Sequence, residues 1–126
     1  MWSLLAALTA GTLMISPSVA EAETAREMFA KCDQTFAGAA IDGETVSIPQ
    51  TDSAGWCWGA FEVIQRIVVY ADESNIRFFR ICPPPESTRL QIIGTFLAFA
   101  KRHPEQMNRE FTDVALDSLV EAYPCR

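Results

Sequence analysis

The sequence predicts a small all-α domain, approximately a four-helix bundle held by two disulfides, following a cleaved signal peptide. Three observations lead to this fold class. Apolar residues recur at helical spacing in four segments. The chain begins with an uncharged apolar run, which is typical of a signal peptide. All four cysteines follow this run. With 126 residues, the chain has room for one small domain and not for two.

The N-terminal segment has the layout of a secretory signal peptide. No charge occurs over residues 2–15, a proline then breaks the apolar run, and small-x-small cleavage sites end at Ala20 and Ala22. The alternative to a signal peptide is a buried N-terminal helix or a membrane anchor. The run is shorter than the roughly 20 residues that a bilayer span needs. We therefore expect a signal peptide at 1–22 and a mature, exported domain at 23–126, with no membrane association after cleavage.

The first helix of the mature domain is expected at about 24–36. Thr24 and Glu27 have the spacing of a capping box, in which each side chain accepts a hydrogen bond from the other residue's backbone N–H. Apolar positions then follow helical spacing: Ala25, Met28, Phe29, Cys32 and Phe36. The residues from 38 to 49 are rich in turn formers and predict a polar loop.

A second helix is expected at about 53–72, with Asp52 and Ser53 as candidate N-caps. It is apolar around most of its circumference, so it is central to the core or shares a second face with another chain. The apolar positions are Trp56, Ala60, Val63, Ile64, Ile67 and Ala71, widened by Trp58, Phe61, Val68 and Val69. Three prolines after Cys82 predict that residues 73–86 are extended or irregular.

Two further helices complete the predicted bundle. Thr88 and Gln91 form a second capping-box match, which begins a helix at about 88–102. The residue before a proline is pushed out of helical geometry, so His103 marks a break. Apolar residues at helical spacing then predict a last helix at about 109–122.

The four cysteines, Cys32, Cys57, Cys82 and Cys125, predict two disulfides, because their number is even and the chain is predicted to be exported. A zinc site fits poorly, since no two cysteines are closely spaced and the chain has one histidine. Three pairings are possible. We favour Cys32–Cys57 and Cys82–Cys125, because antiparallel neighbouring helices would bring the members of each pair to the same end of the bundle.

Neither catalysis nor a cofactor or metal is indicated. His103 is interpreted as a charge at a helix end, because a catalytic base needs a positioned nucleophile and an orienting acid. Two pairs of acidic residues are interpreted as solvated helix faces or ends: Asp72 with Glu73, and Asp113 with Asp117. The net charge of −6 argues against nucleic-acid binding, which needs a basic patch.

A cluster of aromatic residues has two interpretations, a filled core or an interface. Its members are Trp56, Trp58, Phe61, Phe78 and Phe79. If part of the cluster is exposed, the neighbouring arginines would form the rim of a contact surface. The candidate interface residues are then Trp58, Phe61, Arg77, Phe78 and Arg80.

The order of several short motifs resembles the Rap/Tai immunity-protein family, which is named after type VI secretion immunity proteins. The motifs are Cys57-Trp58-Gly59, Cys82-Pro83-Pro84, His103-Pro104-Glu105 and Ala122-Tyr123-Pro124-Cys125. The chain departs from the family pattern at Ala60 and Val63, where an aromatic residue and a second glycine are usual. The resemblance implies a periplasmic, disulfide-containing helical protein that tends to form homodimers and binds a toxin.

The leading hypothesis is therefore an immunity-type periplasmic protein that neutralises a secreted toxin by direct protein–protein binding, without enzymatic activity. The helix at 53–72 and the segment 73–86 are the expected contact surface. The alternative is a periplasmic stress or chaperone-like helical protein that exposes apolar surface when its carboxylates are protonated. A structural subunit of an envelope complex is a third hypothesis.

Overall fold

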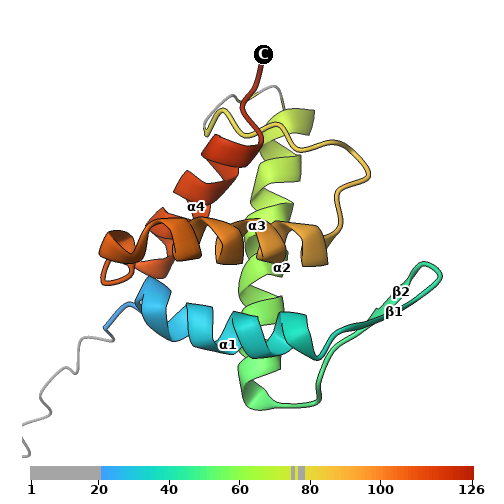
Figure 1. Cartoon of the computed structure of the whole chain (residues 1–126). Coiled ribbons are helices and arrows are strands. Elements are labelled where there is room, and N and C mark those ends of the chain that lie inside the picture. Colours follow the sequence, from blue (N-terminus) through green and yellow to red (C-terminus); the bar gives the residue numbers. More distant parts are fainter. Residues whose placement is uncertain (1–20, 75, 77–78) are drawn as a thin grey trace, which may run out of the picture.

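The computed structural model describes residues 21–74, 76 and 79–126, which form four α-helices, a 3₁₀ helix and a β-hairpin (Figure 1). The helices follow the predicted segments to within two residues at each end. Their bounds are α1 Ala25–Ala37, α2 Asp52–Glu73, α3 Arg89–Arg102, η1 Pro104–Gln106 and α4 Phe111–Ala122. Residues 1–20 of the predicted signal peptide lie outside the described residues.

The prediction of a purely α-helical fold is wrong in one respect, because the expected polar loop contains an antiparallel hairpin. Strands β1 (Ala40–Asp42) and β2 (Thr45–Ser47) pair with Ile41 opposite Val46. Gly43 turns the chain at φ 60°, a left-handed conformation that glycine adopts without steric penalty. Figure 1 shows the hairpin projecting away from the helices.

Helix α2 is the longest element, and both α1 and α3 cross it (Figure 1). It begins one residue earlier than predicted because Thr51 is the N-cap, rather than Asp52 or Ser53. Thr51 Oγ1 accepts a hydrogen bond from Ala54 N at 3.2 Å. None of the helices in the described part of the chain combines the length and the apolar character that crossing a bilayer requires.

Both predicted capping boxes form, and each fixes the start of a helix. At α1, Thr24 N donates to Glu27 Oε2 at 2.8 Å, and Glu27 N donates back to Thr24 Oγ1 at 3.3 Å. At α3, the corresponding distances between Thr88 and Gln91 are 2.8 Å and 3.2 Å. The hydrogen bonds from Thr24 lower the pKa of the Glu27 carboxyl below its usual value.

Three phenylalanine rings from three helices meet at the centre of the core. The ring centroids of Phe61 on α2, Phe96 on α3 and Phe111 on α4 are 5.5 Å apart in each of the three pairs. Two pairs have edge-to-face geometry, which aromatic rings favour over stacking face to face. This contact holds α2, α3 and α4 together, and α1 closes the core through Met28 and Cys32.

Both predicted disulfides are present with the favoured pairing. Cys32–Cys57 joins α1 to the first turns of α2, and neither cysteine has exposed surface. Cys82–Cys125 joins the segment before α3 to the chain end after α4, and Cys82 is exposed. Two backbone hydrogen bonds accompany it: Cys82 N donates to Tyr123 O at 2.7 Å, and Cys125 N donates to Arg80 O at 3.2 Å. The C-terminal cysteine therefore anchors the chain end.

We predict that dithiothreitol reduces Cys82–Cys125 well before Cys32–Cys57 in the native protein. Thiol–disulfide exchange requires the attacking thiolate to reach a sulfur atom, and the Cys32–Cys57 pair is shielded by α1 and α2. Alkylation at timed intervals and peptide mass spectrometry would measure the two rates. In concentrated guanidinium chloride the rates should converge; equal rates in the native protein would contradict the prediction.

Candidate protein-binding surface

Helix α2 exposes a stripe of large apolar side chains on a face that does not belong to the core. The buried residues of α2 are Ala54, Cys57, Phe61, Ile64 and Val68. Five other large apolar residues are exposed, and four of them, excluding Val69, follow one line: Trp56 (64%), Val63 (58%), Ile67 (46%) and Tyr70 (66%). Residues seven, four and three apart fall on one line along a helix. We call these four residues the α2 stripe.

Two glycines of α2 lie beside the stripe, and no contact within the chain requires glycine at either position. Gly55 and Gly59 border a shallow groove of about 610 Å³ next to Trp56. An added Cβ at either glycine would meet no atom within 4 Å. At Gly94 of α3, by contrast, a Cβ would lie 3.0 Å from the Phe36 ring. Each glycine inside a helix destabilises it by roughly 0.5–1 kcal/mol, so this pair suits close approach by another backbone.

Trp58, one of the predicted interface residues, is half-buried and packs against the core. Its exposed face is covered by Arg89 of α3, whose guanidinium carbon lies 4.8 Å from the ring centroid. Arg89 also donates to Glu62 at 3.4 Å and to Gln65 at 3.3 Å. Trp58 therefore joins α2 to α3 more than it offers a free surface.

Of the other predicted interface residues, the structure describes Phe61 and Arg80, which do not share a surface. Phe61 has no exposed area, which corrects its inclusion among them, because it fills the centre of the core. Arg77 and Phe78 lie outside the described residues. Arg80 is exposed, at φ 53°, and lines a hollow of about 140 Å³ together with Arg126.

Sequence reasoning assigned the α2 stripe incompletely. It grouped Trp56, Val63 and Ile67 with Ile64, which belongs to the core face, and left Tyr70 out. A sharper signal was available in the seven-residue repeat of Trp56, Val63 and Tyr70. The repeat marks a narrow line on the helix, distinct from the broader face that meets α1, α3 and α4.

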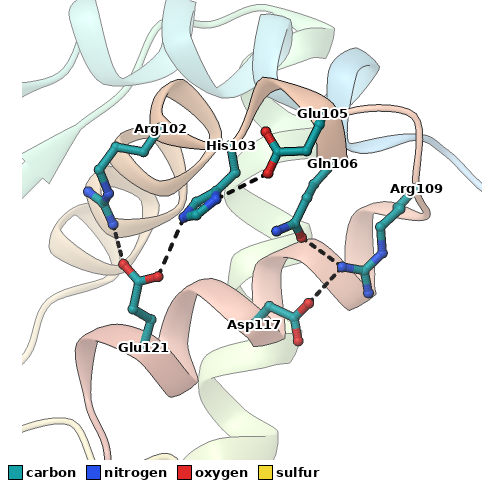
Figure 2. A network of polar contacts seen from close by, with 7 residues as sticks. All are labelled: Arg102, His103, Glu105, Gln106, Arg109, Asp117 and Glu121. Carbon is teal, nitrogen blue, oxygen red and sulfur yellow. Dashed lines mark hydrogen bonds and ion pairs between the residues drawn. The ribbon is translucent and has the colours of Figure 1, made fainter.

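A polar network connects the end of α3 to α4 (Figure 2). Glu121 on α4 is bonded to Arg102, and its second oxygen lies 3.5 Å from His103 Nε2. His103 Nδ1 lies 3.3 Å from Glu105, and the imidazole ring is 4.3 Å from the Phe99 ring. His103 is the C-cap of α3, as the helix-end interpretation expected. The Glu105 carboxyl accepts a hydrogen bond from the backbone N–H of Glu105 itself, which lowers the pKa of this carboxyl.

The network continues from η1 to the middle of α4 through one arginine. Arg109 Nη1 donates to Gln106 at 2.7 Å and to Asp117 at 2.8 Å (Figure 2). Gln106 lies in η1 and Asp117 in the middle of α4, so Arg109 joins these two elements. Within the described residues, moreover, no group of histidine, cysteine and acidic side chains is placed to hold a metal ion. The network is therefore best explained as a brace between α3 and α4.

Together, the fold and the α2 stripe define a class of small, doubly disulfide-bonded helical proteins with an exposed apolar helix face. Comparison with family models gives the family directly. The chain belongs to the Rap1a immunity proteins, whose model matches residues 21–125. No curated protein and no solved structure matches the chain. The resemblance that the sequence motifs indicated is thereby confirmed.

We predict that Phe61→Ala destabilises the protein by about 3–5 kcal/mol, the usual loss for a fully buried phenylalanine. Val69→Ala is the control on the same helix and should change stability by less than about 1 kcal/mol, because Val69 is 45% exposed and lies outside the α2 stripe. Urea unfolding followed by circular dichroism measures both values. Similar losses for the two variants would contradict the assignment of the two faces of α2.

Proposed function

We propose that this chain is an immunity protein that neutralises a secreted toxin by direct protein–protein binding and occludes the toxin without chemistry of its own. The observation that carries the proposal is membership of the Rap1a immunity proteins over residues 21–125. The structure is consistent with it: the prominent surface feature of the described residues is apolar rather than a constellation of reactive groups. Type VI secretion, as the resemblance implies, is the proposed route of the toxin.

We also propose that the protein acts in the periplasm after removal of residues 1–22. Two disulfides favour an oxidising compartment. The expected cleavage sites, after Ala20 or Ala22, both precede Glu23, which contacts α4. Glu23 O accepts a hydrogen bond from Phe111 N at 2.9 Å, which ties the start of the mature chain to α4. Either cut would leave this contact intact.

Deletion of the gene should sensitise cells to sibling cells that deliver the co-encoded effector, because the toxin would then meet no inhibitor. Complementation with the full chain should restore survival, and complementation without residues 1–22 should not, because the protein would stay in the cytoplasm. Competition assays measure both outcomes, and titration calorimetry measures the complex. The proposal is wrong if no co-encoded effector binds the protein and none kills the deletion strain.

We further propose that the protein is a homodimer in which two copies of α2 pack antiparallel. A two-fold interface must be complementary to itself, and the α2 stripe together with the adjacent Gly55 and Gly59 supplies both large and small residues. In a pair centred on Val63, Trp56 of one copy lies beside Tyr70 of the other. The same arrangement sets Ile67 against the open position at Gly59. The two glycines then permit the close approach that the single chain does not need.

Val63→Asp should convert the dimer into a monomer without unfolding it, because it places a charge at the centre of the interface and Val63 is 58% exposed in the single chain. Val120→Asp on α4 is the matched control, since Val120 is also an exposed valine on a helix. Light scattering measures the mass, and thermal unfolding verifies the fold. A monomeric wild-type protein, or equal disruption by both substitutions, would contradict the dimer.

A further inference from the structure

A second groove lies at the C-terminal end of α2, on the side of the helix away from the α2 stripe. At 100° per residue, Asp72 lies about 160° around the helix from Trp56. The groove has a volume of about 520 Å³, within the range of roughly 300–1,000 Å³ that is typical of ligand pockets. Its floor consists of buried aliphatic side chains: Val68, Ile81, Ile92 and Leu119.

The two walls of this groove differ in chemistry. One is the run Pro83–Pro85, which is apolar and has no backbone N–H to donate. The other is the last turn of α2, which carries Asp72 and Glu73. The amide of Gln65, which also lines the groove, donates to Ser87 O at 3.5 Å and accepts from Arg89. Apart from the Ser87 hydroxyl, which can donate or accept, the groove therefore offers acceptors to a ligand.

Asp72 and Glu73 stand where a helix disfavours them. The C-terminal end of a helix carries partial negative charge and is stabilised by cations, yet the last turn of α2 contains no basic residue. Among the ion pairs of the described residues, none involves either carboxylate. Asp72 also borders the hollow that contains Arg80 and Arg126, whereas Glu73 borders only the groove. The local negative potential is therefore available to a positive group from outside.

We propose that this groove receives a lysine or arginine side chain from a basic, partly apolar segment of the toxin. The aliphatic stem of such a side chain packs against the apolar floor, and its charged end reaches the two carboxylates at the rim. The opposite charges and the aliphatic floor select this ligand over an acidic or a purely apolar one. This inference rests on the proposed function, because the toxin is the partner that supplies the segment.

The direct test uses a peptide probe and does not require the toxin. The probe is acetyl-Leu-Arg-Leu-amide, with acetyl-Leu-Glu-Leu-amide as the acidic counterpart, titrated into protein with labelled methyl groups. The arginine peptide should shift the resonances of Val68, Ile81 and Ile92, and added salt should weaken its binding. Absence of shifts at these methyl groups, or an equal response to the acidic peptide, would overturn the inference.

Substitution of the two carboxylates supplies a second readout. Asp72→Asn with Glu73→Gln should weaken binding of the arginine peptide by at least about tenfold, because both charges at the rim are lost. The same variant should unfold at a slightly higher temperature, since α2 loses unfavourable charge at its end. Asp33→Asn with Asp113→Asn is the control, because it removes two charges whose ion pairs are long, at 3.9 Å and 4.0 Å. Equal binding by both variants would contradict the inference.

Binding of the co-encoded effector separates this inference from the proposed function. An effector that binds the wild-type protein but binds the groove variant at least about tenfold more weakly supports both. An effector that binds both proteins equally overturns the groove and leaves the immunity function standing. If no effector binds the wild-type protein, the proposed function fails, and the peptide titration alone decides whether the groove accepts a basic side chain.

Discussion

The arrangement of the whole domain depends on the contact that fixes α1 across the first turns of α2, with the Cys32–Cys57 bond at its centre. Closing a loop of 25 residues gives about 3.5 kcal/mol in a chain-entropy model. That is a large share of the roughly 5–15 kcal/mol by which domains of this size are stable. Because the bond has no exposed surface, it also acts as a core residue pair. With α1 held there, α2 presents its Phe61 face to α3 and α4.

One helix then serves three purposes on three sides. The face through Phe61 and Val68 builds the core, the α2 stripe remains uncovered, and the last turn borders the groove beside Pro83–Pro85. These uses conflict with the stability of the helix itself, since Gly55 and Gly59 weaken its interior and two acidic residues lie at its negative end. Local departures from good helix design of this kind are expected where a protein meets a partner.

The helical framework followed from the sequence because its signals are local. Capping boxes and proline breaks fix where helices begin and end. The cysteine pairing was predicted from antiparallel neighbours and is correct, although α1 crosses α2 instead of lying antiparallel to it (Figure 1). The hairpin was missed because each strand has three residues and a single large apolar side chain, Ile41 or Val46, too few to show alternation. Phe61 and Trp56 were not assigned to different sides, because apolar residues around most of α2 obscure the seven-residue repeat that separates them. The groove is lined by residues of α2, α3 and α4, and a local sequence pattern cannot predict which distant residues lie together.

The disulfide between Cys82 and Cys125 can form only under oxidising conditions, which bears on when the groove is completed. This bond joins the residue before the three-proline wall to the chain end, and with two backbone hydrogen bonds it restrains one wall of the groove. If the chain is exported as proposed, this disulfide would form only after the chain reaches an oxidising compartment. Oxidation would thus decide where in the cell this wall of the groove becomes restrained.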